Sequence, residues 1–344
     1  MNCLRLDAKN ERLIYKKSEI PKVTHDKEVV IKVVLAGVCG TDLHIVEGKF
    51  NAADGVVLGH EFVGIIHEVP KISSFKVGER VLVNPNITCG VCFYCKRSQF
   101  NFCQQGGMNY TIGISVDGGF AEYCKAHISM VFKMPSSVQF EQAVLCEPIS
   151  CITHGLDIMG EIPIGSKILI LGAGIIGLLW CGLLHHLGHR NVYVVQRSVG
   201  RRKTVNELGL GYKCISWEEF EACQKDCPEY KLDYVIDGSG NTDAMFRALP
   251  HLQKGGKLII FGVADPAKKI EVSPFEIYKM EMTIIGIQVN TNPSFQRAIN
   301  FIEAMGDKYF TFEKLNIRTY KLEEYETAFK DLNDRKYTKI VFKF

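Results

Sequence analysis

The cysteines are the residues of this chain whose spacing most clearly suggests chemistry. Four of the thirteen stand in one short segment, with the pattern Cys89-x2-Cys92-x2-Cys95-x7-Cys103. Four thiolates in a short loop can enclose one tetrahedral ion, and closed four-cysteine sites are typically structural zinc sites. A zinc-ribbon module for nucleic acids would instead separate two Cys-x2-Cys pairs by about 15–20 residues. The segment therefore predicts a structural zinc site, with four buried or reactive thiols as the alternative.

A second set of possible metal ligands is spread along the chain. It comprises Cys39, the neighbours His60 and Glu61, and Glu147. One soft thiolate, one imidazole and one or two carboxylates would leave a coordination position open, as a catalytic zinc requires. Spacing alone does not separate this set from a cysteine in the core and a histidine that holds a loop, so both interpretations stand.

A glycine-rich turn, Gly172-Ala-Gly-Ile-Ile-Gly177, fits the G-x-G-x-x-G pattern. It follows an apolar run typical of a strand and opens an apolar helix, the context in which the pattern predicts a dinucleotide site. Gly172 permits the tight turn, Gly174 lets a pyrophosphate approach the backbone, and Gly177 allows close packing of helix and strand. The alternative is that the glycines serve only helix packing. The expected cofactor contacts also include two residues that open the helix and two that follow later strands: Ile175, Ile176, Gly238 and Val263.

The end of the second expected strand indicates which nicotinamide cofactor binds. An NAD site usually has Asp or Glu there, about 20 residues after the glycine turn, to hold the ribose hydroxyls. This chain has Gln196, followed by Arg197, Ser198, Arg201 and Arg202. A neutral side chain does not repel a 2′-phosphate, and guanidinium groups bind phosphate in a bidentate manner, which favours NADP(H) over NAD(H). In the alternative, Gln196 binds both ribose hydroxyls and the arginines are a solvated helix start.

Two types of segment must position these residues. Up to about residue 145 the chain has short β-branched runs bounded by turn residues, which predict strands at 28–35, 61–69 and 76–83. Strands and helices then alternate, with strands expected at 167–171, 191–195, 234–237, 257–261 and 283–286. Helices are expected between them at 175–187, 201–208 and 243–252. This alternation predicts an α/β fold with a doubly wound parallel sheet of the Rossmann type.

The rest of the chain returns to a different pattern. Helices are expected at 294–305 and 322–333, and a strand at 339–343. Because the nucleotide-binding segment is then flanked on both sides, we expect the flanks to form a second, discontinuous domain. The predicted division is a catalytic zinc-binding domain of residues 1–148 and 288–344 and a nucleotide-binding domain of residues 149–287.

Composition excludes other classes of protein. A chain of 344 residues suits two domains, and its net charge of +3 is spread along the chain rather than gathered in a nucleic-acid-binding stripe. The N-terminus has no apolar segment of a secretion signal. The longest apolar stretch, 168–184, is interrupted by glycines and falls short of the roughly 20 residues of a membrane helix. We therefore expect a cytoplasmic protein that acts on a small molecule, without nucleic-acid or membrane partners.

Several motifs in fixed order resemble the zinc-containing medium-chain dehydrogenase/reductase family, most closely its polyol branch of sorbitol, arabitol and related threonine and butanediol dehydrogenases. The resemblance covers nearly the whole chain. Besides the four-cysteine segment, Glu147-Pro148 and the glycine turn, it rests on Gly37-Val-Cys-Gly-Thr-Asp-Leu-His44, Gly59-His-Glu-Phe-Val-Gly64, Val77-Gly-Glu-Arg-Val81 and Asp117-Gly-Gly-Phe-Ala-Glu-Tyr123. It implies a mainly-β GroES-like catalytic domain beside the Rossmann domain, and a homo-oligomer, either a tetramer or a dimer, in which the nucleotide-domain sheet extends across a subunit boundary.

The resemblance also implies roles for single residues. Cys39 and His60 would bind a catalytic zinc, and Glu61 and Glu147 would complete its set. One of the two carboxylates would be a direct ligand and the other would act directly or through water, and this choice stays open. A second, structural zinc would be held by Cys89, Cys92, Cys95 and Cys103.

Two further residues match the proton path of the family. Thr41 matches the hydroxyl residue that takes the substrate proton, and His44 matches the relay position after it. A turn residue and a surface residue are the respective alternatives.

One segment departs from sorbitol dehydrogenases, which have an Arg-Tyr pair beyond the last nucleotide-domain strand. Here the region reads Gly286-Ile-Gln-Val-Asn-Thr-Asn-Pro293 and lacks the arginine. We therefore expect a smaller polyol or a vicinal diol, with Gln288 or Asn290 near the substrate. A threonine- or butanediol-type dehydrogenase is the alternative within enzymes, and a non-catalytic redox sensor or structural protein of the same fold is the alternative outside them.

Overall fold

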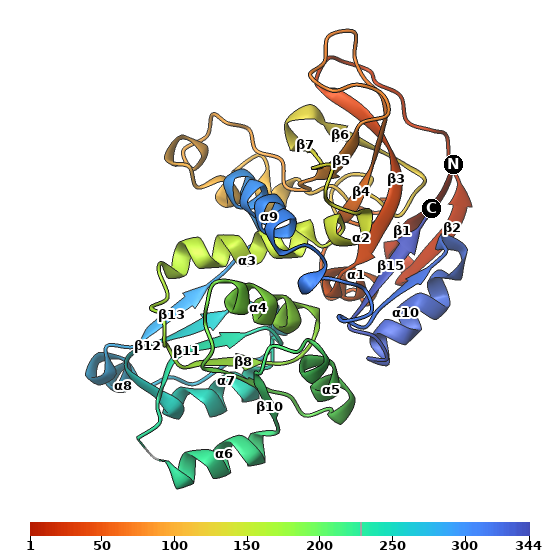
Figure 1. The fold of residues 1–344 in the computed structure, drawn as a ribbon. Helices are drawn as coiled ribbons and strands as arrows, with labels where there is room; N and C mark the ends of the chain where they lie inside the picture. Colours follow the sequence, from red (N-terminus) through yellow and green to blue (C-terminus); the bar gives the residue numbers. More distant parts are fainter. Residues whose placement is uncertain (228) are drawn as a thin grey trace. The chain divides into compact units, whose positions relative to one another are not determined.

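The computed structural model describes residues 1–227 and 229–344 (Figure 1). The chain divides into two compact units, each with its own sheet. Unit 1 comprises Met1–Thr153, Val289–Phe312 and Asn316–Phe344, and unit 2 comprises His154–Gln288 and Glu313–Leu315.

Unit 2 is built on a parallel sheet with the strand order β10-β9-β8-β11-β12-β13. Its strands are β8 (Ile168–Leu171), β9 (Val192–Val195), β10 (Lys213–Ile215), β11 (Leu232–Asp237), β12 (Leu252–Ile260) and β13 (Thr283–Gly286). Its helices are α4 (Ile175–His186), α5 (Val199–Glu207), α6 (Trp217–Asp226), α7 (Thr242–Ala248) and α8 (Pro274–Met280). This is the strand order of the Rossmann fold, so the expected doubly wound sheet is confirmed.

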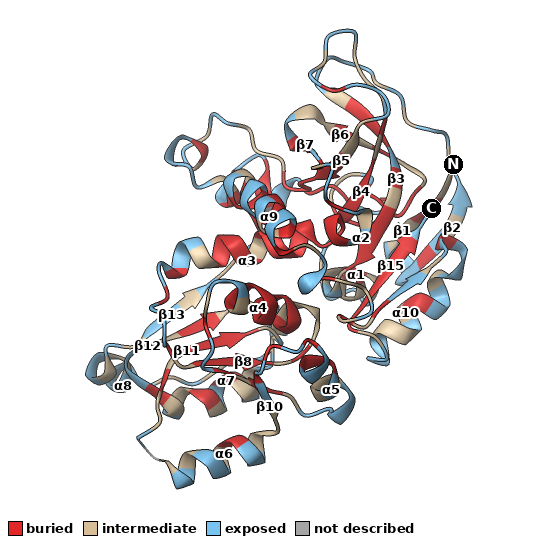
Figure 2. Ribbon diagram, in the orientation of Figure 1, coloured by how far each residue is buried: buried red, intermediate tan, exposed pale blue. Residues whose placement is uncertain are grey.

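Burial explains why β8 and α4 could be predicted from their continuous apolar sequences. All four residues of β8 are buried, and α4 buries the run from Gly177 to Leu184 (Figure 2). A strand buried on both faces has a continuous apolar sequence rather than an alternating one. In Figure 1, α4 and α7 lie on opposite faces of this sheet, as a doubly wound fold requires.

Four elements of unit 2 differ from the expectation, one of them helix α8, which was not expected. The helix expected at 243–252 ends earlier, because Pro250 stands in a single 3₁₀ turn and Leu252 already pairs with Leu232 as the first residue of β12. Strand β10 was not expected, since its three residues are too few for a pattern. Helix α6 was also missed, although Ser216 and Glu219 form a capping box at its start, which is a readable signal.

Unit 1 is mainly β, as expected. Its larger sheet has the order β14-β15-β3-β4-β5-β7, with β6 also paired to β3, and β1 and β2 form a separate hairpin. The strands are β1 (Asn2–Asp7), β2 (Arg12–Lys17), β3 (Glu28–Val38), β4 (Glu61–Glu68), β5 (Arg80–Val83), β6 (Tyr123–His127), β7 (Val131–Lys133), β14 (Ile317–Tyr320) and β15 (Lys339–Lys343). The helices are α1 (Gly40–Val46), α2 (Phe140–Ala143), α9 (Asn292–Met305) and α10 (Tyr325–Asn333), while α3 (Cys146–Met159) crosses the boundary between the units.

The core of unit 1 joins segments from both ends of the chain. Phe120 packs edge-on against Phe342 of β15, with ring centroids 5.1 Å apart, and Phe329 of α10 stacks on Phe342. Strand β15 pairs antiparallel with the end of β3, which places Val341 opposite Gly37. The C-terminal strand thereby supports the segment that leads into Cys39.

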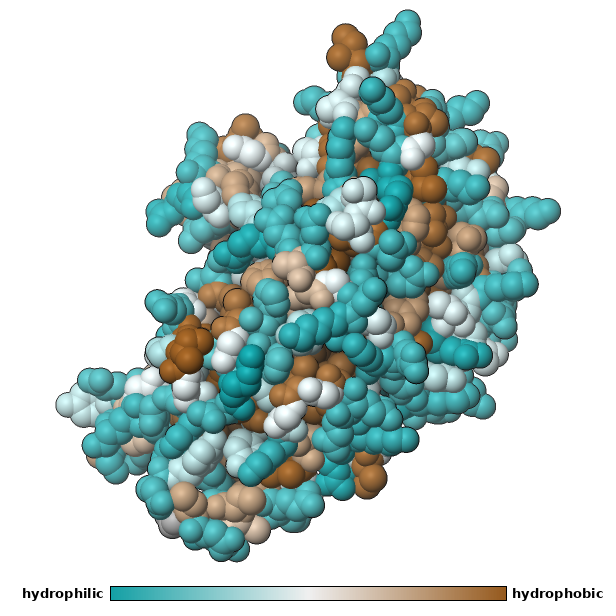
Figure 3. Space-filling model, viewed as in Figure 1, coloured by the Kyte–Doolittle hydropathy of each residue, from teal (hydrophilic) through white to brown (hydrophobic). Residues whose placement is uncertain are grey.

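The surface is mostly hydrophilic on the face shown in Figure 3, with small separate hydrophobic groups. None of the helices in the described residues combines the length and apolarity needed to cross a bilayer.

Candidate functional site

Cys39 stands where β3 ends and α1 begins. It is the N-cap residue of α1, and the carboxylate of Asp42 at position N3 accepts a hydrogen bond from the Cys39 backbone nitrogen at 2.8 Å. Asp42 is fully buried, and its other oxygen lies 3.6 Å from Nδ1 of His60. A metal-binding histidine almost always directs its second nitrogen at such a partner, which fixes the ring and leaves Nε2 for the metal. The sequence analysis did not identify Asp42, although it stands within the motif around Cys39.

His60 and Glu61 lie at the start of β4, directly beside the Cys39 segment. Glu61 pairs with Gly37 in the antiparallel register of β4 and β3. The loop before His60 is held by the motif at 117–123, because the Gly119 nitrogen donates to the Gly59 carbonyl at 2.7 Å. Two motifs that are distant in sequence thus fix one histidine.

The sulfur of Cys39, a ring nitrogen of His60 and a carboxylate oxygen of Glu61 all lie within 4.8 Å of one another. Around a zinc ion with bonds of about 2.0–2.3 Å, neighbouring ligand atoms are about 3.3–3.8 Å apart. The three groups therefore fit a zinc ion with a small contraction, and they leave a coordination position open. The charges suit a cation: burial alone would lower the pKa of His60, but Asp42 and Cys39 raise it well above its ordinary value.

A buried lysine, Lys339, completes this cluster. Its ammonium group forms an ion pair with Glu61 and donates to the Val38 carbonyl at 3.2 Å. A Cβ at position 37 would lie 2.6 Å from a Glu61 oxygen and 2.8 Å from the Lys339 Cε, which explains the glycine there. Burial would lower the pKa of Lys339, but Glu61 and Cys39 raise it. The sequence analysis did not single out this lysine.

Glu147 is buried near the same cluster but lies outside the group of mutually close ligand atoms. It stands in the first turn of α3, and its Oε1 accepts a hydrogen bond from Nδ2 of Asn290 at 3.3 Å and lies 3.6 Å from the Cys151 sulfur. Burial raises the pKa of Glu147 to about 7, with His60 lowering it and Glu61 raising it further. Of the two candidate carboxylates, Glu61 is the one in the compact ligand group.

The two candidate proton carriers lie on α1. The hydroxyl of Thr41 is 3.6 Å from the Cys39 sulfur, next to the candidate metal ligands. His44 lies one turn further along, with 40% of its side chain exposed and its Nδ1 4.0 Å from Glu47. The helix thus runs from the ligand group toward solvent.

The four cysteines at 89–103 converge as the spacing predicts. All four sulfurs lie within 4.8 Å of one another, with Cys89 to Cys95 and Cys92 to Cys103 each 4.0 Å apart. A tetrahedral zinc with Zn–S bonds of about 2.3 Å has sulfurs about 3.8 Å apart. Backbone amides of Cys95 and Gln104 lower the pKa of Cys92 to about 6, which favours the thiolate. The cluster fits a closed, four-thiolate zinc site.

The glycine turn of unit 2 is tight and closely packed against α4. Gly172 has φ +94°, and a Cβ on Gly177 would lie 2.0 Å from the Gly172 carbonyl oxygen. Gly174 is the N-cap of α4, so Ile175 and Ile176 open the helix, and the first amides of a helix are groups that can bind an anion. A Cβ on Gly238, just after β11, would lie 3.3 Å from the Gly177 nitrogen, so the ends of β8 and β11 meet here.

The residues after β9 have unequal freedom to bind a cofactor phosphate. Gln196 accepts a hydrogen bond from the Ala173 nitrogen at 3.2 Å, so it braces the glycine turn. A guanidinium nitrogen of Arg201 lies 3.8 Å from the position of a Cβ on Gly174. Arg202 is paired with Glu219 at 3.1 Å, whereas Arg197 and Ser198 are exposed. Val263 is also exposed, and its carbonyl lies close to Gly240.

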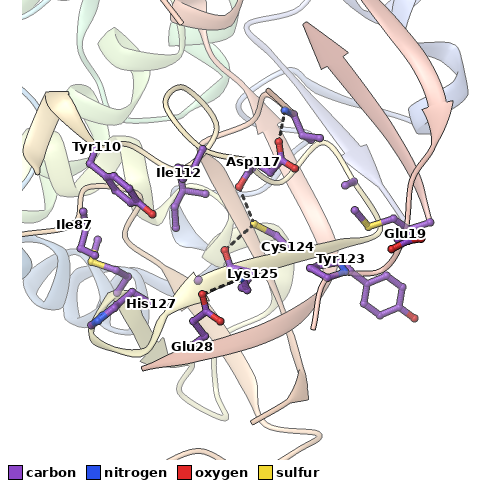
Figure 4. Close-up of a pocket in the computed structure, with 18 of the residues that line it drawn as sticks. Glu19, Glu28, Ile87, Tyr110, Ile112, Asp117, Tyr123, Cys124, Lys125 and His127 are labelled. Carbon is purple, nitrogen blue, oxygen red and sulfur yellow. Dashed lines mark hydrogen bonds and ion pairs between the residues drawn. The ribbon is translucent and has the colours of Figure 1, made fainter. Parts of the chain in front are cut away.

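A pocket of about 350 Å³ in unit 1 contains none of these residues (Figure 4). Four of its charged groups are paired within the chain: Asp117 binds Arg5 with both oxygens at 2.9 Å, and Lys125 binds Glu28 at 2.8 Å. The pocket does not include the ligand atoms that converge around Cys39.

Comparisons with known proteins agree with this geometry. Residues 25–136 match the model of the alcohol dehydrogenase GroES-like domain, and residues 140–344 match that of the glucose dehydrogenase C-terminus. D-arabinitol dehydrogenase 1 of Uromyces fabae is 32% identical over 333 residues, covering 95% of this chain and 93% of that protein. Sorbitol, L-threonine and 2R,3R-butanediol dehydrogenases are also among the similar proteins.

Two solved structures are similar over the whole length of the chain. One is a Sinorhizobium meliloti protein assigned as a zinc-binding dehydrogenase and bound to NADP, with a TM-score of 0.90 and 27% identity. The other is a short chain alcohol dehydrogenase of Escherichia coli CFT073 in complex with NADH, with a TM-score of 0.89 and 27% identity. Each match covers 100% of this chain and 99% of the other.

Proposed function

The chain belongs to the zinc-containing medium-chain dehydrogenase/reductase family, in its polyol-dehydrogenase-like branch, and from this premise we propose that it interconverts a polyol or vicinal diol and the corresponding ketone with NADP(H). As a member it is an oxidoreductase that acts on CH–OH groups with a nicotinamide cofactor. The observation that carries the proposal is the close grouping of Cys39, His60 and Glu61.

We assign the catalytic zinc to Cys39, His60 and Glu61, with Glu147 as the further carboxylate, and the structural zinc to the four cysteines at 89–103. When bound, the catalytic zinc lowers the pKa of an alcohol it contacts, and the nicotinamide accepts hydride. Asp42 holds the ring of His60, and Lys339 balances the negative charge of Glu61 in the buried cluster.

Proton transfer is assigned to α1. The Thr41 hydroxyl, 3.6 Å from the Cys39 sulfur, takes the substrate proton as it passes its own proton on toward His44. His44, with 40% of its side chain exposed, exchanges that proton with solvent. A positioned acid or base of this kind contributes roughly 10²–10⁴-fold to a rate.

The preference for NADP(H) rests on the end of β9. No carboxylate stands there to bind a ribose diol or repel a 2′-phosphate, and Gln196 is already bonded to the glycine turn. Arg197 is exposed two residues after β9, and a guanidinium nitrogen of Arg201 lies 3.8 Å from the position of a Cβ on Gly174, and we assign both residues to the cofactor phosphates. The solved relatives hold NADP in one case and NADH in the other, which supports the class of cofactor rather than the choice.

A substrate scan tests the proposal directly. Purified protein is mixed with an arabitol, sorbitol, 2,3-butanediol and L-threonine, each with NADP⁺ and with NAD⁺, and the reduced nicotinamide is followed by its absorbance. We expect the arabitol or the diol with NADP⁺ to give the highest kcat/KM. A clear preference for L-threonine would favour the threonine-type alternative, and no turnover with any alcohol would contradict the function.

A further inference from the structure

The side chain of Asn290 is committed to other protein groups rather than free for substrate. Asn290 is 1% exposed, and its Nδ2 donates to Oε1 of Glu147 at 3.3 Å. Its Oδ1 accepts from Nδ2 of Asn86, also at 3.3 Å. With the amide reversed, an oxygen would face the Glu147 carboxylate, so the orientation is determined by charge. The expectation that Gln288 or Asn290 lies near the substrate stays a prediction.

The hydrogen bonds continue behind Asn290. Asn86 is 4% exposed, and its backbone nitrogen donates to Asn84 at 3.1 Å. Its Oδ1 and the Gly107 carbonyl each lie 3.0 Å from the Thr111 hydroxyl, whose one hydrogen they share. The amide donors of Asn86 and Asn290 point the same way, and the series ends on the Glu147 carboxylate. Hydrogen bonds aligned in this manner polarise one another in a buried environment.

The backbone on either side of Asn290 is held in an unusual way. Val289 has φ +45°, a left-handed conformation that is strained for a β-branched residue. On the other side, Thr291 caps α9 and exchanges hydrogen bonds with Ser294. Strain of this kind persists only where the surroundings over-determine the conformation, and it occurs often at functional sites.

The far end of the series lies where the chain enters and leaves the four-cysteine lobe, the segment that holds Cys89 to Cys103. Asn86 and Thr111 face each other as an isolated bridge just outside the segment 89–103. The Gly107 nitrogen also donates to the Ile87 carbonyl at 2.7 Å, and this hydrogen bond joins the segment that enters the lobe to the segment that leaves it. The donor series is therefore anchored in a rigid part of unit 1.

We propose that Asn290 is a positioning residue for Glu147. By occupying Oε1 it leaves the other carboxylate oxygen as the one available to the ion at Cys39 and His60. This inference rests on the proposed metal site. Groups that orient metal-site carboxylates in this way typically change metal affinity by about 10–100-fold when they are replaced.

Zinc affinity of the metal-free protein, measured by competition with a chromophoric chelator, provides the test. Asn290→Asp has the same shape and keeps the acceptor for Asn86, but it replaces the donor toward Glu147 with an acceptor. We expect one of the two zinc-binding steps to weaken by at least about 10-fold and the other, at the four cysteines, to stay unchanged. Cobalt substitution gives a second readout, because the visible bands of the catalytic site should shift.

The matched control is Asn292→Asp, the same change two residues along the chain. Asn292 accepts from Nδ2 of Asn84 at 2.7 Å, an interaction that Asp retains, whereas it is Asn290 that donates to Glu147. Its two zinc affinities and cobalt bands should equal those of the wild type. If Asn290→Asp does not fold, Thr111→Val removes the first donor of the series and should weaken the catalytic step several-fold.

The results separate the two claims. A wild-type protein that binds both metals, with Asn290→Asp or Thr111→Val showing unchanged catalytic-site affinity and cobalt bands, would overturn the positioning role alone. A wild-type protein that binds metal only at the four cysteines would overturn the proposed function, and this inference with it.

Discussion

A lysine buried beside three acidic groups characterises the candidate metal site at the scale of single residues. Lys339 is 1% exposed, and it faces Glu61 while its charge is also felt by Cys39 and Glu147. Three anionic ligands around a divalent ion would leave one negative charge, which this lysine offsets. The Glu61 carboxylate can then either form an ion pair with Lys339 or bind the metal ion.

We expect Lys339→Met to destabilise the metal-free protein by about 3–5 kcal/mol, because it leaves the Glu61 carboxylate buried without a partner. Adding Glu61→Gln should restore much of that free energy of unfolding, since neither charge then remains. Denaturant unfolding of the metal-free proteins measures both values. Equal stability of Lys339→Met and the wild type would show that the pair is not buried.

Cofactor choice is also decided by single residues. Gln196→Asp combined with Arg197→Ala should shift the ratio of kcat/KM values toward NAD(H) by on the order of 100-fold, because a carboxylate opposes the 2′-phosphate and one guanidinium is lost. Arg202→Ala is the control, since Arg202 is paired with Glu219, and it should leave the ratio nearly unchanged. An unaltered preference in the double variant would show that these residues do not contact the phosphate.

We expect the fold of the four-cysteine lobe to depend on a bound metal ion. It contains three short 3₁₀ turns and loops between 84 and 111, and four sulfurs converge at its centre. Zinc binding to such a site contributes directly to folding. We therefore assign the lobe a role in the stability of unit 1 rather than in catalysis.

Cys92→Ser should lower the zinc content from two ions per chain to one and reduce the unfolding temperature. Cys223→Ser, which changes an exposed cysteine of α6, should alter neither. Elemental analysis and thermal unfolding measure the two quantities. Full zinc content and normal stability in Cys92→Ser would count against a structural zinc.

The elements that the sequence predicts well are those with local patterns. Strand β8, the glycine turn and α4 follow one another within the chain, and burial on all sides makes them continuously apolar. The cysteine lobe is equally local. Strand β10 could not be predicted, because three residues are too few to show a periodic pattern. The predicted end of the helix at 243–252 was wrong, because the helix stops before Pro250.

Contacts between distant segments could not be predicted in this way. Lys339 reaches Glu61 only because β15 pairs with the end of β3, about 300 residues earlier in the chain, and nothing near Lys339 indicates that register. Asn290 likewise meets Glu147 across 143 residues. The motif residues Cys39, His60 and Glu61 were found because the family resemblance places them, whereas their supporting groups became visible only in the fold.

At the scale of the whole molecule, the free edge of the unit 2 sheet suggests self-association. Strand β13 pairs only with β12 among the described strands, and Ile284 on it is 37% exposed. Phe275 and Tyr278 on α8 are 64% and 81% exposed. An uncovered edge strand with apolar neighbours is a template for pairing with another chain. The family resemblance implies that two copies join their sheets at such an edge, and we expect that edge to be β13.

Ile284→Lys should therefore shift the protein to a smaller species in sedimentation experiments, because a charge on an edge strand opposes pairing. Ile164→Lys, at a residue that is 73% exposed elsewhere in unit 2, should leave the assembly unchanged. A wild-type protein that sediments as a monomer would contradict the proposed interface.

The most direct test of the whole account compares Cys39→Ser with the wild type in one assay of zinc content, folding and alcohol oxidation. The variant should keep the zinc at the four cysteines and a cooperative unfolding transition, lose the second zinc, and lose turnover by several orders of magnitude. If Cys39→Ser still oxidised the preferred alcohol at a substantial fraction of the wild-type rate, the assignment of the catalytic zinc to Cys39, His60 and Glu61 would be wrong.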